Sequence, residues 1–204
     1  MRQKEHFKIE FLTDNRKTKI EDVLSRRQPT LTLVLENIND PHNLSAVIRS
    51  CDAVGVLEVC LVYYGGQKFP KVNEKSSATA HKWVEQKKFE SIDECFIYLR
   101  ECNKKIYTTK MSIESKSLYD LELTQPVALV FGNEHDGVSD RAVELADGNF
   151  LIPQVGMIQS LNISVAAAVS LYEAFRQRNE AKMYDVKQFS NDVYNNLLNE
   201  WAKN

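Results

Sequence analysis

Three short segments carry polar or charged side chains directly after apolar runs that have the composition of buried strands. They are residues 37–53, 131–139 and 152–164. Ligands of an open α/β sheet bind outside the carboxyl ends of its parallel strands, which is where these segments would lie. Each segment alone also fits an ordinary structural role. Their joint occurrence, in order along the chain, favours one shared binding site.

The segment 152–164 predicts a tight bend before a long helix. Pro153 and Gly156 mark a turn, and Ser160, Asn162 and Ser164 offer small polar groups where the helix begins. The first turns of this helix are rich in valine and alanine, which predicts that it packs on the sheet. The alternative is a plain strand-to-helix turn with a Ser or Asn cap.

The segment 37–53 predicts a helix with one apolar and one polar face. His42, Ser45, Arg49 and Asp52 recur at three- and four-residue steps, and Asn43 is placed to cap the helix. Arg49 then emerges about two turns into the helix. The alternative is a solvated arginine paired with Asp52, an interaction of a few tenths of a kcal/mol.

The segment 131–139 brackets an acid with glycines. Gly132 and Gly137 flank Glu134 just after an apolar run, and glycine lets a backbone approach a ligand closely. The spacing is neither that of a dinucleotide fingerprint nor that of a P-loop. The alternative is a turn with an exposed carboxylate.

Composition excludes several classes of protein. The 204 residues carry a net charge of −2 with a pI of about 6.1, so an RNA partner would need a local basic patch. The four cysteines form no Cys-x-x-Cys pair, which predicts a reduced, cytoplasmic protein without a metal site. No apolar run reaches membrane-spanning length, and the charged N-terminus lacks the apolar core of a signal peptide.

Strands and helices alternate along the middle of the chain. Strands are predicted at 30–36, 59–63, 105–109, 127–131 and 150–152, and helices at 43–54, 74–84, 91–102, 139–146 and 163–178. This order predicts an α/β fold with a mainly parallel sheet and helices on both faces. We divide the chain into an N-terminal helical extension (1–29), a central domain (30–180) and a C-terminal helix (181–204). The apolar stripe of that last helix requires a partner, either its own domain or a second subunit.

With these segments in view, the chain resembles the SPOUT superfamily of RNA methyltransferases, and within it the TrmH family of tRNA guanosine 2'-O-ribose methyltransferases. The resemblance runs from about residue 20 to 178. It is carried by Ser25-Arg26-Arg27-Gln28-Pro29, by the stretch 40–52, by Gly132-Asn133-Glu134 and by Gly156-Met157-Ile158-Gln159-Ser160-Leu161-Asn162. The resemblance implies a deep trefoil knot in the C-terminal part of the sheet domain, which the general rarity of knots would not suggest.

The resemblance also implies a cofactor, a partner and residue roles. S-adenosylmethionine would be held by the knot loops, around Thr109, Gly132, Ile152, Met157 and Leu161. The protein would be a homodimer whose active site draws on both subunits and would need no metal. The expected catalytic residues are Arg49, Asn43, Glu134, Ser160 and Asn162, and the expected tRNA-binding residues are Arg26, Arg27, Arg176 and Arg178.

In the implied reaction a ribose 2'-oxygen displaces a methyl group from the cofactor. Because a guanidinium stays protonated in proteins, we expect Arg49 to orient the hydroxyl and stabilise the developing alkoxide. Glu134 would orient Arg49 or a loop, and the proton acceptor stays open between an RNA phosphate and an unidentified residue. The preferred substrate is the D-loop guanosine at tRNA position 18. Ribosomal RNA, a wobble ribose and a catalytically silent RNA-binding protein are the alternatives.

Overall fold

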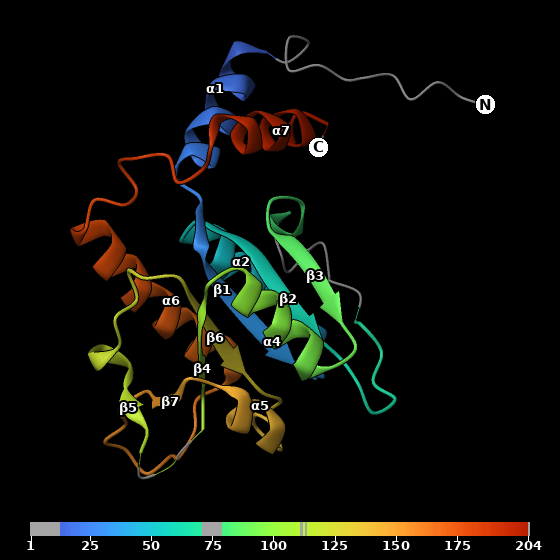
Figure 1. Cartoon of the computed structure of the whole chain (residues 1–204), viewed down its shortest axis with the longest axis vertical. Helices are drawn as coiled ribbons and strands as arrows, with labels where there is room; N and C mark the ends of the chain where they lie inside the picture. Colours follow the sequence, from blue (N-terminus) through green and yellow to red (C-terminus); the bar gives the residue numbers. More distant parts are fainter. Residues whose placement is uncertain (1–12, 71–78, 111, 113, 204) are drawn as a thin grey trace.

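The central element is a seven-stranded sheet in which every pair of neighbours runs parallel. A computed structural model describes residues 13–70, 79–110, 112 and 114–203 and gives the strand order β3-β2-β1-β6-β4-β7-β5 (Figure 1). The strands are β1 Gln28–Glu36, β2 Val56–Val62, β3 Glu85–Phe89, β4 Lys105–Thr108, β5 Lys116–Ser117, β6 Val127–Phe131 and β7 Gly148–Leu151. The predicted α/β class with a mainly parallel sheet is confirmed.

Helices cover both faces of the sheet, and the alternation of side chains along β1 shows how. Leu31, Leu33 and Leu35 pack beneath α2 and α6, whereas Val34 packs beneath α4 and α5. These helices are α2 Pro41–Ala53, α4 Ile92–Glu101, α5 Asp140–Leu145 and α6 Ile163–Glu180, and two short 3₁₀ helices are η2 Ala80–Lys82 and η3 Leu118–Asp120. The helix after 152–164 therefore lies on the sheet, as its valines and alanines predict.

The two terminal helices pack on each other at one end of the molecule. They are α1 Asp14–Ser25 and α7 Asn191–Trp201 (Figure 1). Ile20, Leu24 and Trp201 form the buried centre of their contact. The apolar stripe of the last helix thus finds its partner within its own chain. The predicted N-terminal helix lies partly outside the described residues, because 1–12 are not described.

Two strands were not predicted, and both lack an apolar run. β3 reads Glu-Gln-Lys-Lys-Phe and forms one edge of the sheet, where charged side chains discourage pairing with another chain. β5 has only two residues and forms the other edge. The helix predicted at 74–84 lies mostly outside the described residues. Its described end is the single turn η2.

The chain changes direction across the sheet between β1 and β6. After β1 it continues to β2 on one side, and after β6 it continues past β4 to β7 on the other side. The loops that follow β1 and β6 therefore diverge at the carboxyl ends of two neighbouring strands. A crevice at such a switch point is where open α/β sheets bind their ligands.

Candidate active site

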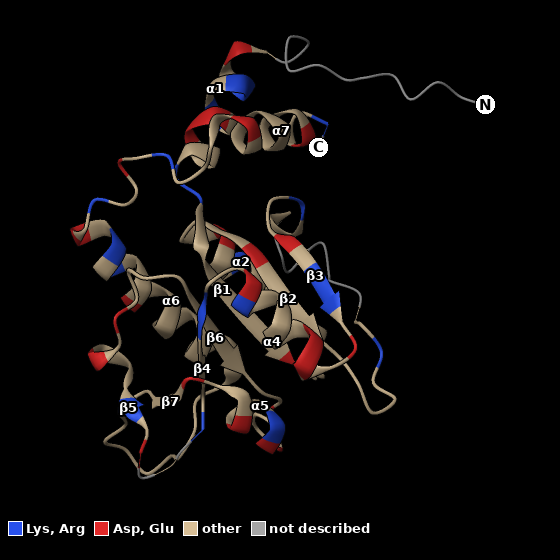
Figure 2. Cartoon of the chain, in the orientation of Figure 1, with Lys and Arg blue, Asp and Glu red and all other residues tan. Residues whose placement is uncertain are grey.

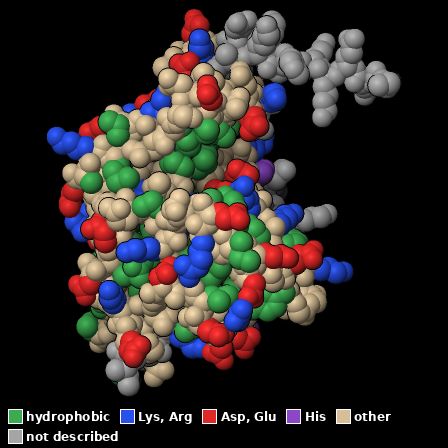
Figure 3. Space-filling view, in the orientation of Figure 1, with side chains coloured by type: hydrophobic (Ala, Val, Ile, Leu, Met, Phe, Trp, Pro, Cys, Tyr) green, Lys and Arg blue, Asp and Glu red, His purple; other side chains and the backbone are tan. Residues whose placement is uncertain are grey.

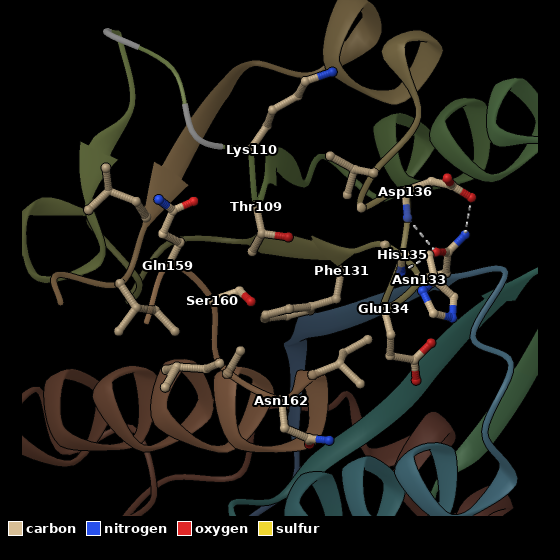
Figure 4. Close-up of a pocket in the computed structure, with 18 of the residues that line it drawn as sticks. Thr109, Lys110, Phe131, Asn133, Glu134, His135, Asp136, Gln159, Ser160 and Asn162 are labelled. Atoms are coloured by element: carbon tan, nitrogen blue, oxygen red, sulfur yellow. Dashed lines mark hydrogen bonds between the residues drawn. The ribbon is translucent and has the colours of Figure 1, made fainter. Parts of the chain in front are cut away.

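A cavity of about 900 Å³ opens at this end of the sheet, a volume typical of a small-molecule site. Its walls are the chain after β4, the loop 131–138 after β6 and the loop between β7 and α6. Figure 4 shows Phe131 and Ser160 in the middle of the cavity, with Lys110 at one end and Asn162 at the other. The three strand ends that line it all belong to the half of the sheet beyond β1.

The loop 132–138 folds back on itself so tightly that only glycine fits at its start. A Cβ atom on Gly132 would lie 1.9 Å from the carbonyl carbon of Gly137. The backbone N–H of Gly137 donates to the carbonyl of Asn133 at 3.0 Å, and the Asn133 side chain accepts from the backbone N–H of His135 and Asp136. These bonds present Glu134 at the cavity wall.

Asn43 joins the two sides of the site. Its Nδ2 donates to Oε1 of Glu134 at 2.7 Å, and its Oδ1 accepts from Nδ2 of Asn162 at 3.1 Å. Glu134 and Asn162 lie 91 and 119 positions after Asn43 in the sequence, yet the three residues form one chain of hydrogen bonds. The expectation that loops at neighbouring strand ends meet in space holds for these three residues.

The caps of two helices explain why these amides are available. Asp40, rather than Asn43, caps α2, with its carboxylate accepting from the backbone N–H of His42 at 2.8 Å. The prediction that Asn43 caps this helix is therefore wrong, and its side chain is free for the site. Asn162 does cap α6 through Oδ1, which accepts from the backbone N–H of Ser164 at 2.9 Å. Its Nδ2 still reaches Asn43, so capping and site roles coexist.

Arg49 lies outside this group. It is exposed on α2 and does not line the cavity. Six residues beyond Asn43, it lies about 9 Å further along the helix axis and on a different face. Its suggested partner Asp52 instead binds the buried Arg27. Within one subunit the structure therefore brings together four of the five expected catalytic residues and leaves Arg49 apart.

The expected cofactor residues divide in a similar way. Thr109, Gly132, Ile152 and Leu161 line the cavity, whereas Met157 is fully exposed and does not line it. Sequence reasoning missed Lys110 and His135, which also line it. Lys110 follows the strand end at 105–109, so the rule about carboxyl ends, applied to this strand as well, would have found it. Its ammonium pairs with Asp140.

The four arginines expected to bind tRNA have partners within the chain. Arg27 and Arg178 are fully buried, which leaves no face of either guanidinium for a phosphate. Arg26 pairs with Asp22 at 2.7 Å, and Arg176 pairs with both Glu173 and Glu180 at 2.8 Å. Figure 2 shows acidic residues beside basic ones on the helices α1, α4, α5 and α6. Burial therefore overturns the assignment of Arg27 and Arg178 to RNA binding.

The described residues offer neither a metal site nor a membrane-spanning helix. Within the described residues, no group of three His, Cys, Asp or Glu side chains could hold a metal ion. In the same part of the chain, no helix is both long and apolar enough to cross a membrane. The four cysteines are free thiols, and only Cys102 is exposed.

Replacing Asn43 with aspartate tests the hydrogen-bonded chain. The new carboxylate cannot donate to Glu134 and puts a like charge beside it, so both loops shift. We expect turnover at this site to fall by about 100-fold, the size of effect that small misplacements produce. Steady-state kinetics measure it. Asn39→Asp, in the exposed loop before α2, adds the same charge and is the matched control. Equal activity of the two variants would contradict the role of Asn43.

Comparison with known proteins places this site in a family. The model of the SpoU rRNA methylase family matches residues 30–172. A tRNA (guanosine(18)-2'-O)-methyltransferase of Thermus thermophilus is 45% identical over 191 residues, which are 94% of this chain and 97% of the relative. The protein of the same name from Escherichia coli is 38% identical over 173 residues, 85% of this chain and 75% of the relative.

Solved structures lead to the same family as the sequence relatives. The A. aeolicus TrmH/SpoU tRNA modifying enzyme superimposes with a TM-score of 0.86 at 39% identity, covering 93% of this chain and 96% of that chain. The SpoU methyltransferase AviRb from Streptomyces viridochromogenes, solved in complex with AdoMet, superimposes with a TM-score of 0.67 at 28% identity. That match covers 78% of this chain and 64% of that chain. The chain therefore belongs to the SpoU methylase family, as a TrmH-type member of the SPOUT superfamily.

Proposed function

We propose that the protein transfers a methyl group from S-adenosylmethionine to the ribose 2'-hydroxyl of guanosine 18 in tRNA. The observation that carries the proposal is the cavity at the carboxyl ends of β4, β6 and β7, closed at one end by the Asn43–Glu134–Asn162 chain. Relatives named for this reaction, 38–45% identical over at least 85% of the chain, support the choice of substrate. The free thiols suit a reducing compartment, and we place the protein in the cytoplasm.

The cavity fits the proposed cofactor. Phe131, Phe150 and Ile152 give it an apolar lining, and Glu134 brings a carboxylate. No backbone N–H from 154 to 161 donates to another described residue, so these groups are open to an adenosine or an amino acid moiety. Bound there, the cofactor would supply a methyl group activated by a sulfonium. Thr109, Gly132, Ile152 and Leu161 are the residues that would hold it.

The residues of the chain then have to position and activate a ribose hydroxyl. Asn43 fixes the carboxylate of Glu134 through a hydrogen bond of 2.7 Å, which keeps the acid at the cavity wall. Ser160 lines the same cavity and offers a hydroxyl toward a ribose. Arg49 remains the cation that orients the 2'-hydroxyl and stabilises the developing alkoxide. The distance of Arg49 from the cavity of its own subunit argues that it serves the cavity of another.

A homodimer supplies that second subunit. Five exposed apolar side chains lie on the loop after β7 and on the outer face of α6, namely Val155, Met157, Ile158, Val165 and Tyr172. Such exposed apolar groups are typical of a protein interface. A partner seated here covers the loop 154–160 and brings its own residues to the cavity. We also propose that the chain around this loop forms the trefoil knot of SPOUT proteins. The strand order supports this proposal, because β7 lies between β4 and β5, two strands that precede it in the sequence.

The test is transfer of a labelled methyl group to an unmodified tRNA transcript, followed by mapping of the labelled ribose. We expect label at guanosine 18 and none in a transcript that carries 2'-deoxyguanosine there. Label at the wobble ribose or only in ribosomal RNA would replace the proposed substrate. Binding of tRNA without any transfer would indicate a silent RNA-binding protein.

Replacing Arg49 with lysine should abolish most activity while leaving the fold and cofactor binding intact. Lysine keeps the charge but cannot present the planar fork of a guanidinium. We expect methyl transfer to fall by about 100-fold or more, as for the loss of one oxyanion-stabilising donor. Calorimetry with S-adenosylmethionine measures the retained binding. Near-normal turnover by the variant would remove Arg49 from the mechanism.

Mixed dimers show which subunit provides Arg49. Arg49→Lys and Asn43→Asp subunits, each inactive alone, are unfolded together and refolded to form mixed dimers. If each site combines Arg49 of one subunit with the cavity of the other, one site of every mixed dimer is intact. Half of the dimers are then mixed, with one of two sites active, so about a quarter of the wild-type activity returns. No recovery would place Arg49 and the cavity in the same subunit.

A further inference from the structure

A second cavity lies at the opposite end of α2, where the terminal helices meet the body of the protein. It has a volume of about 460 Å³ and is lined by α1, by the region around η2 and by the end of α7. Figure 3 shows apolar side chains gathered below the terminal helices, with charged side chains around them. The proposed methyl transfer makes no use of this cavity.

Both tryptophans of the chain line it. The rings of Trp83 and Trp201 meet edge to face, with centroids 5.1 Å apart and an interplanar angle of 61°. Trp201 is only 6% exposed, and the guanidinium of Arg27 lies 5.0 Å from its ring centroid. Trp201 is therefore a buried side chain at the base of the cavity, whereas Trp83 is partly exposed and its ring is accessible to a ligand. Aromatic rings of this kind stack on unpaired bases.

The rim of the cavity carries two cations, and neither pairs with a side chain in the part of the chain that the structure describes. Arg16 and Lys19 are three residues apart on α1 and both are exposed. Neither side chain makes an ion pair or a hydrogen bond with any other described residue. Among the described lining residues, Asp52 is the one acid, and it already pairs with Arg27. This differs from Arg26 and Arg176, whose charges are offset by carboxylates. An anion is the ligand that these charges favour.

We propose that this cavity binds one unstacked nucleotide of the RNA substrate, with its base on Trp83 and its phosphate between Arg16 and Lys19. The assignment rests on the proposed function for the choice of RNA. The chemistry is that of single-strand recognition, in which a stacking ring and nearby cations act together. The protein would then have a second contact site for its substrate. Asp52, which lines this second cavity, lies about 14 Å from Asn43 along the axis of α2.

Tryptophan emission reports directly on the cavity, because the chain has no other tryptophan. The full-length protein is titrated with unmodified tRNA transcript. We expect quenching with wild type, and an increase of about tenfold in the Kd of Trp83→Ala, which loses the stacking ring. An emission change when the protein alone is diluted would show that a second copy fills the cavity, and would overturn the proposal.

Charge is tested by the double variant R16A/K19A against Lys17→Ala, which lies on the same helix but does not line the cavity. We expect the double variant to raise KM for tRNA at unchanged kcat. The salt dependence of its log K should become shallower by about one to two units relative to wild type. The same KM and the same salt slope as Lys17→Ala would overturn the proposal. If wild type binds tRNA with quenching but transfers no methyl group, the proposed function fails and the nucleotide site stands.

Discussion

Gly132→Ala is expected to abolish methyl transfer. The added Cβ would lie 1.9 Å from the carbonyl carbon and oxygen of Gly137 and 2.1 Å from the backbone nitrogen of Val138. All three are backbone atoms, so no side chain can turn away to make room. The loop that presents Glu134 must open instead. A displacement of about 1 Å at a reacting centre already costs about 100-fold in rate, and this change is larger.

The measurements for Gly132→Ala are kinetic and thermodynamic. Activity should fall below detection, and calorimetry should show loss of S-adenosylmethionine binding, while circular dichroism shows whether the sheet persists. Gly65→Ala is the control, since a Cβ at Gly65 meets no atom within 4 Å and Gly65, in the loop after β2, does not line the cavity. The left-handed φ of +65° at this position costs about 1 kcal/mol of stability in the alanine variant but leaves the site unchanged. Wild-type kcat/KM in Gly132→Ala would show that this loop does not shape the site.

Arg178→Met is expected to destabilise the whole domain. The guanidinium of Arg178 is fully buried and donates five hydrogen bonds, through Nε to Leu123, through Nη1 to Gln28 and Thr30, and through Nη2 to Thr30 and Gln125. These bonds tie α6 to the start of β1 and to the loop before β6. Burial lowers the pKa of Arg178 to about 10, so the group is still charged at neutral pH.

Methionine fills much of the same space but leaves buried carbonyl groups without donors. We expect the free energy of unfolding to drop by about 3–5 kcal/mol, as when one partner of a buried charged network is removed. Chemical denaturation measures it. Arg176→Met is the matched control two residues earlier, where exposed ion pairs contribute about 1 kcal/mol or less. A similar loss in both variants would mean that the buried network adds little.

Periodicity predicts those parts of the chain that are apolar enough to show it. The cores of β1, β2 and β6, and the helices covering them, lie where the sequence places them, because their burial on both faces requires unbroken apolar runs. β4 also lies where it is predicted, although only Ile106 and Tyr107 of its four residues are apolar. β3 and β5 escape prediction because edge strands need no such pattern. The expectation of a knot comes only from the family resemblance, since no local spacing encodes how a chain is threaded.

The site too is predictable from the sequence only in part. The polar residues after each strand end are visible in the sequence, and Asn43, Glu134 and Asn162 do meet. Which of them bond to which depends on long-range packing of α2 against α6. The arginines show the limit most clearly. Arg176 and Arg178 are two residues apart, yet one is exposed and the other has no exposed surface, because helix rotation turns only Arg178 toward the sheet.

Helix α2 also fixes the distance between the two cavities. Asn43 lies at one end of the helix, beside the cavity at the carboxyl ends of the strands. Asp52 lies at the other end, in the wall of the second cavity, which Trp83 and Trp201 line. Nine residues of rigid helix fix their spacing at about 14 Å along the axis. An RNA whose fold holds two exposed nucleotides at the matching separation can fill both cavities together. Substrates would then be sorted by three-dimensional shape, without any reading of base sequence between the two points.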